Sequence, residues 1–323
     1  MLIRRICILG GTGFVGRALA NRLAREGLQM RILTRDRERN RRSLILLPNV
    51  DLVQANVHDP DALALHFTGC DVVVNLVGIL NERGRDGSGF RFAHVDLARK
   101  IIEACRSAGV RRLLHMSALN ADARSGPSHY LRSKGEGEDL VHAAAELHVT
   151  SFRPSVIFGG EDSFFNRFAR LLRLTPAVFP LACPAARFEP VHVGDVVEAF
   201  WLTLVDPGAY GRRFSLCGPR AYSLQQLVEY TAQCIGARRR VIPLPDLLSR
   251  IQAAVFDFVP GKPFSTDNYL STRVDSVCGC NDLPALGITP VALEAIVPAY
   301  LSDRDSRSRY GEFRSQSRRH AAR

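Results

Sequence analysis

Short apolar runs alternate with amphipathic helical segments along the first part of the chain. The runs are rich in β-branched residues, as strands buried on both faces of a parallel sheet require. Regular alternation of strand and helix predicts an α/β fold built on a Rossmann-type doubly wound parallel sheet, whose strand carboxyl ends all lie at one edge. The expected strands span residues 6–9, 29–34, 50–55, 71–78 and 112–116.

The regular alternation stops after residue 153, and this divides the chain. We expect residues 1–153 to form the Rossmann domain, joined by return segments near residues 187–217. Residues 154–300 are expected to form mainly a smaller C-terminal α/β lobe that binds substrate or a partner.

Weaker signals predict the elements of this lobe. An aromatic and apolar stripe over residues 164–172 predicts an amphipathic helix, the prolines at 176–184 predict a loop, and residues 187–193 predict a short strand. Asp195 and Ser223 are expected to cap the helices that follow them, Ser223 as part of a capping box.

Two later segments have unusual compositions. Residues 242–260 mix proline with large apolar side chains, and their helical spacing favours a lobe helix over a surface that faces a partner or a membrane. Both interpretations stay open. The apolar pattern ends at Leu301, and the basic, serine-rich residues 301–323 are predicted to be a disordered tail.

The stretch from Gly10 to Gly16 follows the first expected strand and opens a helix. Its glycines match the G-x-G-x-x-G spacing, in which one glycine allows a tight turn, one lets backbone N–H groups approach a pyrophosphate, and one lets helix and strand pack closely. The helix N-terminus offers further N–H donors to an anion. We therefore predict that a dinucleotide binds to Gly10, Gly11, Thr12, Gly13, Phe14, Val15 and Gly16.

The end of the second expected strand distinguishes two cofactors. An acidic residue there binds a ribose 2′-OH, whereas an arginine suits a 2′-phosphate. Arg35 and Arg37 therefore predict NADP(H) in preference to NAD(H), although Asp36 between them has the chemistry for NAD(H). The alternative is that both arginines are loop charges that face solvent.

Two further strand ends are expected to contact the cofactor. Asn56 and Val57 follow the third expected strand and are predicted to lie against the adenine. Val77 and Gly78, at the end of the fourth, are predicted to lie beneath the cofactor.

Three side chains after the fifth expected strand form a candidate catalytic group. Ser117 ends the strand, and Tyr130 and Lys134 are four residues apart, which on a helix places phenol and ammonium on one face. A cation beside a phenol favours phenolate, and an oxidised nicotinamide acts in the same direction. We therefore predict that Tyr130 is a general acid or base with a lowered pKa, that Lys134 tunes it, and that Ser117 hydrogen-bonds the reacting oxygen.

Composition excludes several classes of protein. The chain is 46% hydrophobic, has no apolar run long enough for a membrane helix and shows no secretory signal, so we expect a globular cytoplasmic protein. Its scattered cysteines, such as Cys7, Cys105 and Cys217, lie in apolar patterns, which predicts reduced thiols rather than disulfides. Cys278 and Cys280 form a C-x-C pair without a second pair nearby, so no metal site is expected.

The net charge of +11 is concentrated in two arginine-rich segments. One runs from Arg31 to Arg42 and the other from Arg304 to the end of the chain. Neither has the interleaved aromatic residues that single-stranded nucleic acids require, so no nucleic-acid partner is expected. Peripheral contact with an anionic inner membrane, or a solvated face and tail, are the alternatives.

Taken together, these motifs resemble the extended and atypical short-chain dehydrogenase/reductases, which are NAD-dependent epimerase/dehydratase-like proteins. Within them the nearest likeness is to the atypical group that includes the NAD(P)-binding accessory subunit of respiratory complex I and its bacterial relatives. The resemblance covers roughly residues 1–300. It rests on the glycine stretch, Ser117, the Tyr130/Lys134 pair, Arg153-Pro154-Ser155-Val156-Ile157-Phe158-Gly159 and Pro190-Val191-His192-Val193-Gly194-Asp195-Val196.

The resemblance implies NADP(H) in the Rossmann half and a smaller lobe that closes over the nicotinamide. The contacts it implies are Gly10, Gly13 and Gly16 to the pyrophosphate, Arg35 to the 2′-phosphate, Tyr130 and Lys134 to the nicotinamide ribose and the reacting group, and Pro154 and Ser155 near the carboxamide.

Two departures from the resemblance bear on substrate and mechanism. Ser117 precedes Tyr130 by 13 residues, a shorter spacing than in the sugar-nucleotide epimerases of the superfamily, which disfavours nucleotide-sugar chemistry. His94 stands where many relatives place an asparagine with a structural or proton-relay role.

Two functions from different classes follow. In one, the protein is an NADP(H)-dependent oxidoreductase that moves a hydride between the nicotinamide and an unidentified carbonyl or quinone-like substrate, with Tyr130 as the acid or base. In the other, it is a non-catalytic, NADP(H)-loaded accessory or assembly subunit of a membrane-associated respiratory or quinone-pathway complex. The intact Ser117, Tyr130 and Lys134 favour the first, and the resemblance favours the second.

Overall fold

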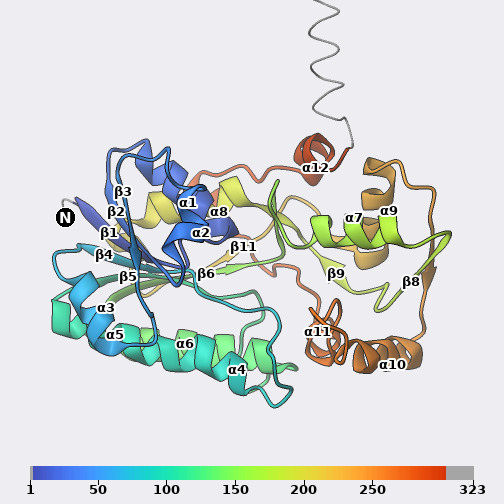
Figure 1. Ribbon diagram of the computed structural model, residues 1–323, viewed down its shortest axis with the longest axis horizontal. Coiled ribbons are helices and arrows are strands. Elements are labelled where there is room, and N and C mark those ends of the chain that lie inside the picture. The colour runs from blue at the N-terminus through green and yellow to red at the C-terminus, as the bar shows by residue number, and fades with distance from the viewer. Residues whose placement is uncertain (1–2, 303–323) are drawn as a thin grey trace, which may run out of the picture.

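The computed structural model describes residues 3–302 and centres on one parallel sheet of seven strands (Figure 1). The strands are β1 (Arg5–Leu9), β2 (Gln29–Thr34), β3 (Val50–Gln54), β4 (Val72–Asn75), β5 (Arg112–Met116), β6 (His148–Pro154) and β11 (Arg213–Leu216). Their order is β11-β6-β5-β4-β1-β2-β3. The order reverses between β1 and β4, which is the switch point of a doubly wound sheet. The predicted Rossmann-type fold is therefore confirmed.

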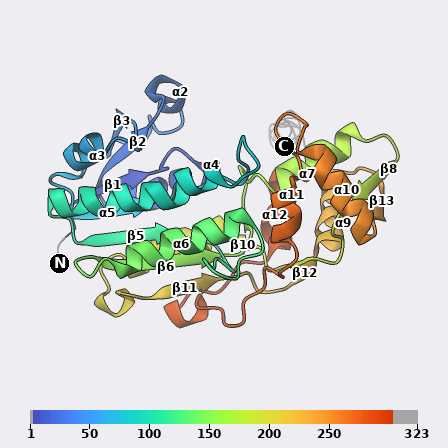
Figure 2. The same ribbon diagram turned by 90° about the horizontal axis from the view of Figure 1, so that it is seen from below.

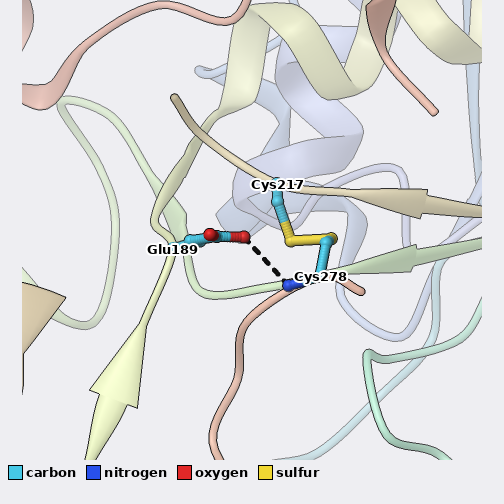
Figure 3. Close-up of side chains that lie close together, drawn as sticks. All are labelled: Glu189, Cys217 and Cys278. Atoms are coloured by element: carbon cyan, nitrogen blue, oxygen red, sulfur yellow. Dashed lines mark hydrogen bonds between the residues drawn. A yellow bond between two sulfur atoms is a disulfide. The ribbon is translucent and has the colours of Figure 1, made fainter. Parts of the chain in front are cut away.

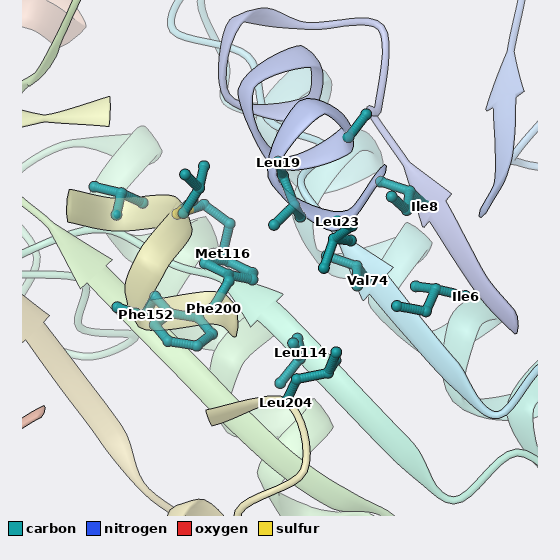
Figure 4. Packing of buried hydrophobic residues seen from close by; sticks show 14 of the residues in the cluster. Ile6, Ile8, Leu19, Leu23, Val74, Leu114, Met116, Phe152, Phe200 and Leu204 are labelled. Carbon is teal, nitrogen blue, oxygen red and sulfur yellow. The ribbon is translucent and has the colours of Figure 1, made fainter. Parts of the chain in front are cut away.

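Two helices, α1 (Phe14–Ala24) and α8 (Val193–Thr203), cover one face of this sheet. Figure 4 shows Leu19 and Leu23 of α1 packed over the apolar side chains of β1 and β4. The Phe200 ring of α8 stacks on Phe152 of β6, with 3.8 Å between ring centroids. This face holds much of the buried apolar area that stabilises the domain.

The opposite face is covered by α3 (Pro60–Phe67), α5 (Leu97–Ala108) and α6 (His129–Ala143), which lie side by side in Figure 2. A short helix α4 (Ser88–Arg91) and a π-helical turn η1 (Phe92–Asp96) lead into α5, and α2 (Arg37–Arg41) follows β2. Asp59 caps α3, with Pro60 in its first turn.

The C-terminal lobe is built from short paired strands and helices, and it lies at the carboxyl ends of the sheet strands (Figures 1 and 2). Its helices are α7 (Phe165–Leu174), α9 (Leu224–Cys234), α10 (Asp246–Phe256), α11 (Thr266–Ser271) and α12 (Leu293–Leu301). Its strands pair as β7 (Ile157–Phe158) with β10 (Val191–His192), β9 (Arg187–Phe188) with β12 (Tyr222–Ser223), and β8 (Val178–Leu181) with β13 (Arg240–Pro243). Two 3₁₀ turns lie at Pro207–Ala209 and Pro284–Leu286.

Several predictions for the lobe were wrong in detail. The loop expected at 176–184 contains β8, because a distant strand, β13, supplies its hydrogen-bond partners. The strand expected at 187–193 is two separate strands followed by the start of α8. Asp195 does not cap α8, since it lies within the first turn and its carboxylate accepts the Val291 N–H at 2.8 Å. The Ser223 capping box is confirmed.

The ends of other expected elements also differ. The strand expected at 71–78 ends at Asn75, whose side-chain oxygen accepts the Val77 N–H and turns the chain out of the sheet. The helix favoured within 242–260 is present as α10. Of the expected tail, residues 303–323 lie outside the described residues. Among the described helices, none has the length and apolar composition needed to cross a bilayer.

Candidate active site

The glycine stretch joins β1 to α1, as predicted. Gly10 has a φ of +76°, and a Cβ at Gly16 would lie 2.4 Å from the Gly10 carbonyl oxygen, so both positions require glycine. Gly13 stands at the N-cap of α1, and no side chain caps the first N–H groups of the helix. These donors are available to an anion, and the positive end of the helix dipole favours one there.

The other residues of the stretch contact neighbouring parts of the protein. A Cβ on Gly11 would lie 2.7 Å from the Ile32 side chain, the Thr12 carbonyl accepts a hydrogen bond from Arg17, and Val15 packs against the core. The Phe14 ring lies against Gly159 of the lobe, where a Cβ would come within 3.1 Å of it.

The segment after β2 carries two exposed arginines, one on each side of Asp36. Arg35 and Arg37 are exposed. One oxygen of the exposed Asp36 carboxylate, Oδ1, caps α2 by accepting the Arg39 N–H at 2.9 Å. The Arg37 N–H donates to the Gln54 side chain at 3.3 Å, which ties α2 to β3.

The segment after β3 contains His58, which the sequence analysis did not identify as a candidate site residue. Asn56 accepts the His58 N–H at 3.0 Å, and Val57 packs against the core below. The His58 ring stacks on Phe92 at 3.8 Å, and its Nδ1 atom is buried without a hydrogen-bond partner. Burial, helped by the charges of Lys100 and Arg35, lowers the pKa of His58, so the ring is neutral at neutral pH.

Ser117 and Lys134 lie at the end of β5. The Lys134 Nζ donates to the Met116 carbonyl at 2.9 Å, and a Cβ on Gly78 would lie 3.1 Å from that nitrogen. Gly78 therefore lies beside the Lys134 ammonium, and the contact of Val77 and Gly78 with the cofactor stays a prediction. Burial lowers the pKa of Lys134 to about 8. Ser117 is buried and its Oγ has no hydrogen-bond partner.

Tyr130 lies in the first turn of α6, and its ring contacts Phe90 and His94 edge-on. The predicted lowering of its pKa was wrong for the protein alone. Burial, reinforced by the Asp267 carboxylate, raises the pKa of Tyr130 to about 12. The phenol is therefore protonated at neutral pH, which suits a proton donor better than a base.

His94 connects the loop after β4 to α6. The Ile79 N–H donates to His94 Nε2 at 3.2 Å, so Nδ1 carries the proton and donates to Ser133 Oγ at 2.8 Å. The Ser133 hydroxyl in turn donates to the Tyr130 carbonyl at 2.9 Å. Burial and the Lys134 charge lower the pKa of His94 well below 6.5. These contacts give His94 a structural role, and its ring has no nitrogen left to relay a proton.

Pro154 and Ser155 lie at the end of β6, beside the segment that follows α11. The Ser155 hydroxyl donates to the Ser276 carbonyl at 2.7 Å, so this segment covers it. Asn120 after β5 also holds the segment, since its side-chain N–H donates to the Asp275 carbonyl at 2.8 Å. The residues expected near the carboxamide are therefore in contact with the lobe.

The prediction of reduced cysteines was wrong for Cys217 and Cys278. They form a disulfide, and the Glu189 carboxylate beside it accepts the Cys278 N–H at 2.9 Å (Figure 3). The three side chains lie close enough to share an ion, but both sulfurs are used by the disulfide bond. Cys7 and Cys105 are buried free thiols, and burial raises the pKa of Cys105 to about 12.

Two buried side-chain atoms lack a partner, and both lie along the edge where the strands end. Within residues 3–302, His58 Nδ1 and Ser117 Oγ are the buried side-chain nitrogen and oxygen atoms without a hydrogen bond. One follows β3 and the other follows β5, with the glycine turn of β1 between them in the sheet order. Buried polar groups in native proteins are nearly always paired, so an elongated polar ligand along this edge fits the residues present.

Residues 6–217 match the model of the NAD dependent epimerase/dehydratase family. The chain belongs to this family. NAD(P) binding at the carboxyl edge of a Rossmann sheet is typical of its members, which agrees with the uncapped N-terminus of α1.

The relatives of this chain carry names that describe different functions. It is 33% identical over 298 residues to the mitochondrial NADH dehydrogenase (ubiquinone) 1 alpha subcomplex subunit 9 of Mus musculus, covering 89% of this chain and 77% of the relative. It is 31% identical over 243 residues to the ceramide reductase of Caulobacter vibrioides, covering 75% of this chain and 74% of the relative. Sequence likeness to family members thus connects the chain with both a respiratory subunit and a reductase.

Solved structures of the family share this fold. The dTDP-glucose 4,6-dehydratase DesIV of Streptomyces venezuelae, with NAD and TYD bound, superposes with a TM-score of 0.72 over 92% of this chain and 95% of that chain. The two sequences are 19% identical. A likeness at that identity supports the architecture of sheet and lobe and leaves the chemistry to the residues of the site.

Proposed function

We propose that the protein is an NADP(H)-dependent oxidoreductase that reduces a carbonyl or quinone-like substrate. The observation that carries the proposal is the buried, unpartnered Ser117 hydroxyl, which directly follows the Met116 carbonyl that accepts the Lys134 ammonium. A hydroxyl left without a partner in the protein alone is suited to a substrate oxygen, because burying it unpaired costs free energy that such a bond recovers.

Each residue of this group has a role in reduction. The reduced nicotinamide, when bound, supplies the hydride. Tyr130 is protonated at neutral pH and gives its proton to the substrate oxygen as that oxygen gains negative charge. Ser117 donates a hydrogen bond to the same oxygen, and the Lys134 ammonium favours the phenolate that Tyr130 leaves behind.

The preference for NADP(H) is supported by the end of β2. Arg35 and Arg37 are exposed on either side of Asp36, whose Oδ1 atom caps α2, so two cations are available to the ribose side of the cofactor. A guanidinium binds a phosphate through paired N–H donors, so a 2′-phosphate gains more from this loop than a 2′-hydroxyl does.

An accessory role is the second candidate, and the relatives favour it. Several curated relatives are named as subunits of mitochondrial NADH dehydrogenase, among them the 40 kDa subunit of Neurospora crassa. In this alternative, bound NADP(H) stabilises the protein within a respiratory or quinone-pathway complex. For both candidates we propose peripheral contact with an anionic inner membrane, supported by the net charge of +11.

Fluorescence titration with NADPH and NADH, followed by a panel of carbonyls and quinones, tests the proposal. We expect NADPH to bind at least tenfold more tightly than NADH. Tyr130→Phe should bind NADPH within twofold of wild type and lower turnover at least 100-fold. Tight NADPH binding without oxidation on any substrate would favour the accessory role, and equal binding of NADH would contradict the role of Arg35.

A further inference from the structure

Helix α10 of the lobe turns its apolar side chains to solvent. Leu247, Ile251 and Val255 are four residues apart, so they form one face of the helix, and their exposed fractions are 68%, 50% and 56%. Phe258, just beyond the helix, is 75% exposed. Leu248, Val259 and Ile242 are also exposed.

Polar side chains on and next to this helix form hydrogen bonds with the rest of the lobe. The Asp246 carboxylate accepts a hydrogen bond from the Tyr269 hydroxyl at 2.7 Å, and Asp257 accepts one from the Thr266 hydroxyl at 2.6 Å. Ser249 is buried and accepts the Cys183 N–H. The outward position of Leu247, Ile251 and Val255 differs from that in an ordinary surface helix, whose large apolar side chains pack on the core. An apolar patch of this kind on a folded protein marks a binding surface.

Cations lie on this helix and beside its C-terminal end. Arg250 is exposed on the helix itself, and the Arg85 guanidinium lies 3.8 Å from the centre of the Phe258 ring. Lys262 Nζ donates to the Gly84 carbonyl at 2.7 Å, which holds the loop of Arg85 against the end of α10. Asp86 is an exposed acid on that loop.

We propose that this face, formed by α10 and residues 258–259, docks on the surface of an anionic lipid bilayer, with α10 lying in the plane of the headgroups. The inference names the surface for the membrane contact proposed above, and it rests on that part of the proposed function and not on hydride transfer. An aliphatic face with a cationic rim is the arrangement of helices that lie in a membrane interface.

The position of α10 connects the bilayer to the candidate active site. Helix α11 packs against α10, and the Asp267 carboxylate of α11 accepts the N–H groups of His129 and Tyr130 at 2.7 and 3.2 Å. A cavity of about 100 Å³ lies between these elements, lined in part by Asp257, Lys262 and Asp267. Docking through α10 therefore places Tyr130 two helices away from the lipid surface.

Vesicle co-sedimentation tests the proposal on the full chain, with vesicles of phosphatidylcholine alone or with 30% phosphatidylglycerol as a roughly physiological anionic fraction. We expect wild type to bind only the anionic vesicles. The variant Leu247→Ser/Ile251→Ser/Phe258→Ser should lose at least tenfold in affinity, while NADPH binding shows that its fold is intact. The matched control, Leu46→Ser/Leu65→Ser, removes side chains that are 89% and 68% exposed elsewhere and should bind like wild type.

Two further measurements distinguish membrane binding through α10 from binding through residues 303–323. Deleting residues 303–323 should leave binding within about threefold, and loss of binding on this deletion alone would assign the contact to the tail and overturn the role of α10. A tryptophan at position 247, made as Leu247→Trp, should shift its emission to the blue with anionic vesicles, whereas Leu65→Trp should not. Equal binding by the triple variant and wild type would overturn the proposal, and no binding by wild type would overturn the membrane contact itself.

Discussion

The Rossmann sheet and the C-terminal lobe differ in which groups they leave without a partner: polar atoms at the edge of the sheet, and apolar side chains on the surface of the lobe. The sheet half is well packed on both faces, and at its edge two polar atoms, His58 Nδ1 and Ser117 Oγ, are buried without partners. The lobe exposes large apolar side chains along α10, while polar residues at the two ends of this helix form hydrogen bonds within the lobe. The first arrangement calls for a polar ligand and the second for an apolar surface.

The two regions also differ in how they are held together. The sheet is stabilised by strands that neighbour one another and by helices that connect them. The lobe has strands of two to four residues, and its pairs join segments far apart in the chain. Its cohesion therefore depends on long-range contacts, including the Cys217–Cys278 disulfide.

The disulfide gives the largest expected effect. Its cysteines are 61 residues apart, and closing a loop of that length stabilises the folded state by about 4 kcal/mol in the chain-entropy model. Reduction, or Cys278→Ser, should lower the free energy of unfolding by about that amount, whereas Cys280→Ser should not. Thiol titration of the unfolded, unreduced protein should find six free cysteines of eight. Eight free thiols would mean that the lobe holds without the crosslink.

Gly16→Ala tests the sheet half at its tightest point. The new Cβ would lie 2.4 Å from the Gly10 carbonyl oxygen and 2.5 Å from the Gly11 Cα, so the backbone must shift. We expect a loss of about 3 kcal/mol in the free energy of unfolding, measured in urea, together with loss of NADPH binding. Gly279→Ala is the control, because a Cβ there meets nothing within 4 Å. Normal NADPH binding by Gly16→Ala would contradict the pyrophosphate contact.

Acid should destabilise the sheet half through its buried histidines. Burial lowers the pKa of His115 to about 3 and of His142 to about 4. The unfolded chain takes up these protons below pH 6.5, but the native protein does not, so stability is complete above that pH and falls as the pH drops toward 4. The buried His115 contributes a slope of about 1.4 kcal/mol per pH unit, and the partly exposed His142 contributes less because solvent screens its charge. His115→Gln should reduce the slope measured by urea unfolding between pH 6 and 4.5, and an unchanged slope would contradict the assignment.

The smallest effect on stability is expected for Ser117→Ala. The hydroxyl makes no hydrogen bond in the protein alone, so its removal should change the free energy of unfolding by less than about 0.5 kcal/mol. Turnover should fall by about 10- to 100-fold, since the hydrogen bond to the reacting oxygen is lost. Thermal unfolding and steady-state kinetics on the same preparation measure the effect on stability and the effect on turnover separately. A large loss of stability would show that Ser117 serves the fold and not the substrate.

What the sequence predicted well is local. The strands of the sheet, the glycine turn and the position of Ser117 at the end of β5 all depend on patterns within a few residues. The pairing of β8 with β13 and the Cys217–Cys278 bond were missed because their halves are about 60 residues apart and neither half carries a signal of its own.

The sequence predicted the positions of the site residues more accurately than their pKa values. The four-residue spacing of Tyr130 and Lys134 indicates a shared helix face, but it does not reveal that burial outweighs the neighbouring cation and raises the pKa of the phenol. His58 directly follows the predicted Asn56 and Val57, and only the structure shows that its ring nitrogen is left unpaired.

The crosslink between Cys217 and Cys278 has a mechanical consequence. It closes a ring that contains β12, α9, β13, α10 and α11. A molecule stretched from its two ends in an optical trap would bypass this ring, and its extended length would be about 200 Å shorter than that of the reduced chain, at roughly 3.4 Å per residue. The part of the lobe proposed to meet the membrane would therefore bear no tension while the rest of the chain is pulled straight.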